Sequence, residues 1–278
     1  MMKSFMSRSL IAALLLGSSS AALSADLDNI IYAPELPRTK PVEVGNGWYL
    51  RGDVSYDFST SGSGDTFRTY DGVSYTARNF TTSSFDTDWG AGIGFGYQFS
   101  NWLRAEAMLN YQQGTLDGSY SSAVVPCSTP VLGTGCSVVG SGEFDSYSAM
   151  TNGYIDLGTY AGFTPYVGAG AGMTYVSYDS FNAQETCIGG ACPVAPPASV
   201  TRPGESDWRF TYALMAGVAY EFMRNLKVDV GYRYTNVSGG DAFGFDGTSA
   251  AGGATGVQGT DNGYSTHAVT TSLRYSLW

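Results

Sequence analysis

The chain has 278 residues, among them 37 glycines, 20 tyrosines, 14 phenylalanines and 5 tryptophans, and only 14% of its residues are charged. The aromatic content excludes a disordered chain, and this much glycine excludes a helical protein. The formal net charge of −10 offers no basic field to phosphates, so we expect no nucleic-acid partner.

The first 25 residues have the pattern of a secretory signal peptide. A basic start with Lys3 and Arg8 leads into an apolar run and then into small residues, so we expect cleavage between Ala22 and Ala25. The apolar run is too short for a membrane helix, and no later run reaches the length that one needs. Residues 26–46 are polar and contain prolines, and we interpret them as an extended leader.

The stretch that follows the leader alternates strictly between two kinds of side chain. Every second residue from Trp48 to Phe58 is apolar or glycine, whereas the intervening set includes Arg51, Asp53 and Asp57. Because side chains alternate across a β-strand, this stretch predicts a strand over residues 47–58 with one apolar and one polar face.

The same alternation recurs along the rest of the chain. It predicts further strands at residues 85–99, 102–112, 144–157, 164–178, 207–222, 226–236 and 264–278. Long segments rich in Gly, Ser, Thr and Asp are predicted as loops at residues 59–84, 113–142, 179–206 and 237–263. Only short connections separate the other strands, so long and short connections alternate.

This rhythm is typical of transmembrane barrels of the bacterial outer membrane. Such barrels have long external loops, tight periplasmic turns and an even number of strands, which leaves both termini in the periplasm. Each predicted strand supplies the ~9–11 residues that span a membrane, and a closed sheet satisfies every backbone group in lipid. We therefore predict an all-β fold, an eight-stranded antiparallel transmembrane barrel over residues 47–278, with a periplasmic leader. A soluble β-sandwich is the alternative, but it leaves the alternating connections unexplained.

In such a barrel the apolar faces contact lipid and the polar faces line the lumen. Eight strands leave an interior only wide enough for side chains, so charged groups there must pair or stay hydrated. We favour a salt-bridged plug over a relay or a selective pore. The predicted lumen network consists of Arg51, Asp53, Asp88, Arg104, Glu106, Asp156, Arg209, Glu221, Lys227, Asp229, Arg233 and Arg274.

Two glycine-rich stretches, GAGIGFG at 90–96 and GAGAG at 168–172, could be mistaken for a dinucleotide-binding motif. That motif requires a following helix, whereas the strand period continues here, so we predict no cofactor. We interpret the glycines as making room for long charged neighbours such as Arg51, Arg104 and Arg209.

The single histidine, His267, is predicted to face outward near the loop end, with Ser265 two residues away. Some barrel enzymes use a histidine and a serine, but no acidic residue of the same strand could orient this pair. We therefore predict no catalytic residues and no enzymatic activity.

The four cysteines fall into two close pairs. In an oxidising compartment local pairing is favoured, although four cysteines allow three connectivities. We predict disulfides within the pairs Cys127/Cys136 and Cys187/Cys192. A zinc site would need CxxC-type spacing and more than one histidine, so we predict no metal site.

The predicted loops carry far more acidic than basic residues. We hypothesise an acidic outer crown that meets lipopolysaccharide through divalent cations, with solvated loop charge as the alternative. Its residues are Asp65, Asp71, Asp117, Glu143, Asp145, Glu185, Glu205, Asp241, Asp246 and Asp261.

Several strand sequences resemble those of a known family. They are GWYLRGDVSYDF, DWGAGIGFGYQFSNWLRAEA, NGYIDLG, TPYVGAGAGMTY and the ending LRYSLW. These resemble the opacity-type, OmpA-like outer-membrane proteins of the porin family in alphaproteobacteria, above all the major surface antigens of rhizobia and their pathogenic relatives. The resemblance covers about residues 47–278 and lies in the strands.

The resemblance implies an abundant surface protein that stabilises the cell envelope and presents loops. Its implied partners are outer-membrane lipid, lipopolysaccharide, the barrel-assembly machinery, and host or surface ligands bound through loops. Two alternatives stay open, a small passive diffusion porin and a surface adhesin or haem-binding receptor. No catalytic residue of the family exists to carry over to this chain.

Overall fold

The computed structural model describes residues 47–62, 64–122, 135–189 and 198–277. The predicted signal peptide and leader lie outside the described residues. The described part is all β except for the five-residue helix α1 (Gly247–Ala251), which confirms the predicted class. None of the described helices is long and apolar enough to cross a membrane.

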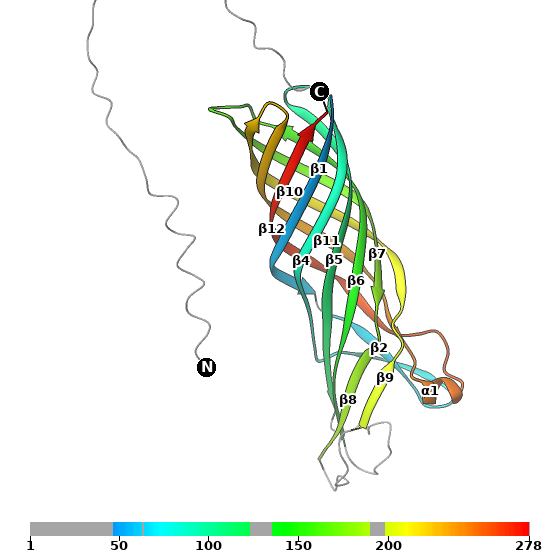
Figure 1. Ribbon diagram of the computed structural model, residues 1–278. Coiled ribbons are helices and arrows are strands. Elements are labelled where there is room, and N and C mark those ends of the chain that lie inside the picture. The colour runs from blue at the N-terminus through cyan, green and yellow to red at the C-terminus, as the bar shows by residue number, and fades with distance from the viewer. Residues whose placement is uncertain (1–46, 63, 123–134, 190–197, 278) are drawn as a thin grey trace, which may run out of the picture. The chain divides into compact units, whose positions relative to one another are not determined.

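Eight long strands form a closed antiparallel ring (Figure 1), because the last of them pairs with the first. In ring order they are β1 (Gly47–Gly62), β4 (Thr82–Gln98), β5 (Leu103–Ser122), β6 (Gly135–Asp156), β7 (Phe163–Tyr178), β10 (Ser206–Met223), β11 (Leu226–Gly244) and β12 (Val257–Ser276). Closure leaves no unpaired edge along the part of the ring nearest the short turns, as a sheet in lipid requires.

The described residues contain twelve strands, not the eight that the sequence predicts. Each predicted strand overlaps one ring strand, but four ring strands, β5, β6, β11 and β12, continue well into the segments predicted as loops. Four further strands lie wholly within two of those segments, namely β2 (Thr66–Tyr70), β3 (Tyr75–Asn79), β8 (Phe181–Ile188) and β9 (Ala198–Arg202). The prediction of long irregular loops is therefore wrong for most of the described positions.

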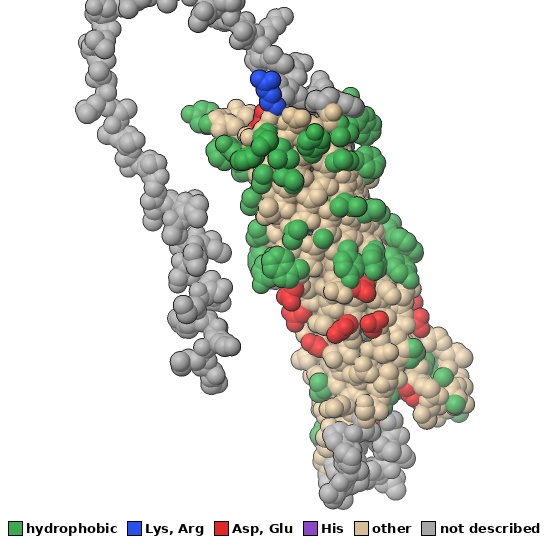
Figure 2. Space-filling view, viewed as in Figure 1, with side chains coloured by type: hydrophobic (Ala, Val, Ile, Leu, Met, Phe, Trp, Pro, Cys, Tyr) green, Lys and Arg blue, Asp and Glu red, His purple; other side chains and the backbone are tan. Residues whose placement is uncertain are grey.

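Apolar side chains cover the outside of the ring near the short turns. On the face seen in Figure 2 they gather in two bands across the barrel. The band beside the short turns includes the exposed side chains of Trp48, Phe99, Trp102, Phe163 and Phe222, and the second includes Tyr56, Trp89, Tyr147, Trp208 and Tyr232. Aromatic girdles of this kind mark the two membrane interfaces in outer-membrane barrels.

Beyond the second band the alternation of side chains is inverted, so that polar residues face outward and apolar residues face inward. On β6, Tyr147 faces outward, but the next outward positions are Asp145 and Glu143, whereas Phe144 between them is buried inside. Acidic side chains form a row beside the second apolar band in Figure 2. Because carboxylates do not tolerate hydrocarbon, this inversion marks where the strands leave the apolar zone.

The strand segments beyond the inversion, which we call the outer extension, enclose an apolar core of their own. Rings stack within it, for example Phe181 on Phe243 with centroids 4.5 Å apart. This outer cluster consists of Phe85, Leu116, Phe144, Val176, Tyr178, Phe181, Ala183, Val237, Ala242, Phe243 and Tyr264. Burial of these side chains explains why glycine-rich and serine-rich segments are ordered as strands, since the apolar residues face inward and are widely spaced along the sequence.

One irregularity interrupts the ring at the level of the inversion. β1 and β4 pair from Gly47 opposite Gln98 up to Tyr56 opposite Trp89, and no main-chain pairing between them follows. A bulge in β4 between Thr87 and Gly90 accompanies this divergence. A bulge bends its strand and re-aims side chains, so the residues around it leave the simple alternation.

Candidate functional site: the charged lumen

Glu106 on β5 lies at the centre of the lumen in the half nearest the short turns. Arg104 Nη1 donates to its Oε1 at 2.7 Å, and the hydroxyl of Tyr49 donates to the same oxygen at 2.8 Å. Arg51 Nη1, from β1, donates to Oε2 at 3.0 Å. All of these side chains are buried. Burial of the three charged groups is tolerated because each is directly hydrogen-bonded to an opposite charge.

The remaining ion pairs extend this centre across the lumen. Arg104 Nε lies 3.2 Å from Asp156 Oδ1 on β6. Asp53 lies between two arginines, with Arg233 Nη2 of β11 at 2.7 Å and Arg51 Nη2 at 3.6 Å. A separate pair joins Arg274 of β12 to Asp229 of β11 at 3.0 Å. Five ring strands therefore contribute charges that meet in the lumen.

Aromatic rings pack against the guanidinium groups. The Arg104 guanidinium lies 4.0 Å from the ring centroid of Tyr154 and 4.8 Å from that of Tyr166. Cation–π contacts are strongest where the cation is desolvated, as here. Rings and ion pairs together form a cluster in the lumen near the short turns, which we call the plug.

Three residues of the predicted network are not part of this plug. Asp88 is exposed beside the β4 bulge, because the extra residue there shifts the alternation. Glu221 is exposed at the short turn between β10 and β11, where it pairs at 3.7 Å with Lys227 at the rim. A fourth residue, Arg209, is buried but belongs to the outer extension, where it pairs with Asp261 at 2.8 Å.

The glycines of β4 and β7 do make room for large side chains, but these are mostly not the predicted arginines. A Cβ at Gly96 would collide with the ring of Tyr49, and one at Gly168 with the ring of Tyr154. At Gly92 it would collide with the carboxylate of Asp53. The prediction of room for arginines is therefore corrected to room for these two tyrosines and this carboxylate.

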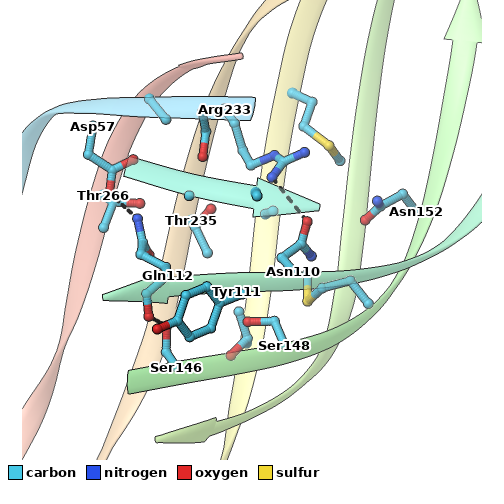
Figure 3. Close-up of a pocket in the computed structure, with 18 residues that line it drawn as sticks. Asp57, Asn110, Tyr111, Gln112, Ser146, Ser148, Asn152, Arg233, Thr235 and Thr266 are labelled. Atoms are coloured by element: carbon cyan, nitrogen blue, oxygen red, sulfur yellow. Dashed lines mark hydrogen bonds between the residues drawn. The ribbon is translucent and has the colours of Figure 1, made fainter. Parts of the chain in front are cut away.

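A cavity of about 60 Å³ lies in the ring beside Met150 and Met215 (Figure 3). Figure 3 shows Asn110 and Arg233 pointing toward each other and Gln112 directed at Asp57, which is buried. Its wall combines hydroxyl and amide groups with the apolar side chains of the two methionines and several alanines, so it is partly polar. The predicted network omits Asp57, although this residue shares the phase of Arg51 and Asp53 on β1.

The hypothesis of an acidic crown is only partly correct. Asp65, Glu185 and Asp261 are buried rather than displayed. Asp261 accepts hydrogen bonds from Arg209 Nη1 at 2.9 Å and from the Tyr178 hydroxyl at 3.0 Å. Burial nevertheless raises the pKa of Asp261 to about 6. These carboxylates hold the outer extension together and cannot meet lipopolysaccharide.

Two of the four cysteines lie in the described residues. Cys136 on β6 stands directly opposite Cys187 on β8, and neither is a free thiol. Cys127 and Cys192 lie outside the described residues, so the predicted pairing stays a prediction.

His267 faces outward in a cluster of aromatic rings. Its Nδ1 shares a hydrogen bond of 2.6 Å with the hydroxyl of Tyr232, whereas the Ser265 hydroxyl bonds to that of Ser61 at 3.0 Å. No hydrogen bond joins His267 to Ser265 in the described part of the chain. Over the same residues no group of three or more His, Cys, Asp and Glu side chains could hold a metal ion.

Comparisons with known proteins identify the family of this chain. The profile of the family described as outer membrane protein beta-barrel domain matches residues 10–276. An uncharacterized protein of Brucella abortus is 36% identical over 285 aligned residues, which cover 95% of each chain. One of Coxiella burnetii is 22% identical and covers 68% of this chain and 74% of its own. Among solved structures, Neisserial surface protein A has a TM-score of 0.43 at 16% identity, covering 84% of this chain and 99% of its own. The chain belongs to the family of outer membrane protein beta-barrel domains.

Proposed function

We propose that this outer-membrane protein is a structural component of the cell envelope with a closed lumen, and that it acts through its outer surface. The observation that carries this proposal is the buried network around Glu106, in which ion pairs and tyrosine rings occupy the lumen. A barrel filled in this way serves as a rigid support for the surface that it presents. Its similarity to an uncharacterized Brucella abortus protein supports an alphaproteobacterial origin, and the role of a surface antigen is part of the proposal.

In the proposed orientation the short turns and both termini face the periplasm and the outer extension faces the cell exterior. Long structured segments at one end and tight turns at the other are the asymmetry of outer-membrane barrels. An epitope inserted at Gly72, in the exposed β2–β3 turn, should be detected by antibody on intact cells. The same epitope inserted between Arg224 and Asn225 should be detected only after the membrane is opened. The reverse pattern would contradict the orientation.

The closed lumen is tested by single-channel recording of the purified, folded protein in a planar bilayer. We expect no steady openings from the wild type, because the ion pairs of Arg51, Arg104 and Glu106 occupy the lumen. Steady openings whose size or ion selectivity follows substitutions at these three residues would identify a small diffusion porin and overturn the proposal.

Lipopolysaccharide is the proposed lipid partner. Exposed carboxylates such as Asp86, Asp88, Asp117 and Glu143 follow the second apolar band, where lipid phosphates lie. Divalent cations would join the two sets of negative groups. We expect a chelator to lower the amount of lipopolysaccharide that copurifies with the protein, and an unchanged amount would dismiss this partner. We also propose that the barrel-assembly machinery inserts this protein into the outer membrane.

A second candidate function is that of a receptor or adhesin for a polar surface ligand. A groove of about 510 Å³ on the outer extension is lined mainly by hydroxyl and amide groups, including Ser84, Ser119, Asn182 and Gln184. Such a lining suits a hydrogen-bonding ligand better than haem. Saturable binding of cell-surface glycans, lost after Asn182→Ala and Gln184→Ala together, would favour this function over a purely structural one.

A further inference from the structure

Asp57 is a buried carboxylate that forms no ion pair with the described residues. Its side chain points inward from β1, and the residue is only 5% exposed. Thr87 and Gln112 both donate to its Oδ2. Its Oδ1 accepts no hydrogen bond, and the carboxylate forms no ion pair, with any residue that the structure describes. Since a buried, unpaired charge is strongly unfavourable, this group must either take up a proton or gain a counterion.

The charge balance of the lumen leads to the same conclusion. Within the part of the ring that carries the apolar bands, the inward-facing charges are Arg51, Arg104, Arg233, Arg274, Asp53, Asp57, Glu106, Asp156 and Asp229. Four positive against five negative groups leave one negative charge. Every acid of this set except Asp57 forms an ion pair with an arginine.

Arg233 lies near Asp57 in the ring but forms its ion pair with Asp53 instead. Both residues stand opposite Ala268, one on each neighbouring strand, so they share a row across β11, β12 and β1. The guanidinium of Arg233 turns away along the lumen, toward Asp53 at 2.7 Å and Asn110 at 3.5 Å. Arg233 is therefore engaged elsewhere, and Asp57 faces the cavity.

We infer that the lumen cavity beside Asp57 binds one small hydrated monovalent cation, such as Na⁺. The cavity of about 60 Å³ is large enough for an ion with several waters, since a water needs roughly 10–15 Å³ by this measure. Ser55, Asn110 and Thr266 line the same cavity and supply further hydroxyl and amide oxygens suited to a hard cation. We choose a monovalent ion because it balances the one excess negative charge of the lumen.

The test is thermal unfolding of the full-length, refolded protein in detergent, followed by tryptophan fluorescence. Sodium chloride is exchanged for N-methyl-D-glucamine chloride at constant ionic strength, so that only the small cation changes. Because a ligand that binds only the folded state stabilises it, we expect sodium to raise the wild-type Tm by about 2–4 °C.

Asp57→Asn keeps the shape of the side chain and removes its charge, so it should lose the sodium dependence. Asp88→Asn, which removes an exposed charge near the same bulge, should keep it. Arg233→Gln leaves the lumen with a second uncompensated negative charge, so it should strengthen the dependence, and it tests the site even if Asp57→Asn fails to fold. If sodium did not change the Tm of the wild type, or changed that of Asp57→Asn by the same amount, the inference would be overturned. It would also be overturned if the Tm depended on sodium only in Arg233→Gln, because Arg233 itself would then be the counter-charge.

Discussion

At the scale of single residues, Glu106 is the side chain on which the lumen depends most. It accepts hydrogen bonds from two arginines and a tyrosine while buried. Glu106→Gln leaves Arg51 and Arg104 close together without the charge between them, so we expect a loss of about 3–5 kcal/mol in the free energy of unfolding.

Urea unfolding in lipid vesicles measures this loss. The matched control is Glu221→Gln, which breaks the exposed pair with Lys227 at the rim and should cost less than about 1 kcal/mol. Equal effects of the two substitutions would contradict a buried network at Glu106.

A second residue-scale prediction compares two glycines of the ring. A methyl group at Gly96 would meet the ring of Tyr49, whereas one at Gly153 meets nothing within 4 Å. Gly96→Ala should therefore destabilise the barrel by about 1–3 kcal/mol, because overpacking displaces the Tyr49 ring that donates to Glu106. Gly153→Ala should be neutral or slightly stabilising. Urea unfolding in lipid vesicles tests this prediction. A loss of stability in Gly96→Ala that does not exceed that in Gly153→Ala would contradict it.

At the scale of elements, β4 runs from the apolar zone of the barrel into the outer extension. Ile93 faces outward midway between Trp89 and Tyr97, whereas Ser84 faces outward beyond the bulge. Ile93→Arg should cost about 2–4 kcal/mol in lipid vesicles, since it places a charge near the middle of the apolar zone. Ser84→Arg should cost under about 1 kcal/mol. If Ser84→Arg were as costly, the membrane boundary would lie farther along the strand than the inversion of polarity indicates.

The outer extension should respond to pH through Asp261. Its pKa of about 6 in the folded state lies above the usual value of an aspartate, so the folded state binds this proton more tightly than the unfolded one. Stability of the extension should therefore fall as pH rises from about 4 to about 6. Hydrogen exchange of the extension amides across this range measures the effect. Asp261→Asn should flatten the profile, and a rise in stability over the same range would contradict the sign.

At the scale of the whole molecule, the barrel has two cores of opposite chemistry, stacked along one ring. The plug near the short turns is ionic, and the outer cluster is aromatic. Phe181→Ala should speed hydrogen exchange in the outer extension and leave the strands around Glu106 protected, because it removes the stacking on Phe243. Glu106→Gln should weaken protection around the plug first. Uniform loss of protection in both variants would mean that the two cores unfold as one unit.

The sequence by itself determined the all-β class and the location of the eight ring segments, because alternation with period two is a local property that each strand displays alone. It also placed Arg51, Asp53 and Glu106 on inward faces. It did not reveal the strands of the outer extension, since their few apolar residues face inward and lie among glycine and serine. Nor could it show that Arg233 pairs with Asp53 while Asp57 on the same strand stays unpaired. Those partnerships depend on the register of β11, β12 and β1 around the closed ring, and main-chain hydrogen bonding between distant segments sets that register rather than any pattern within one strand.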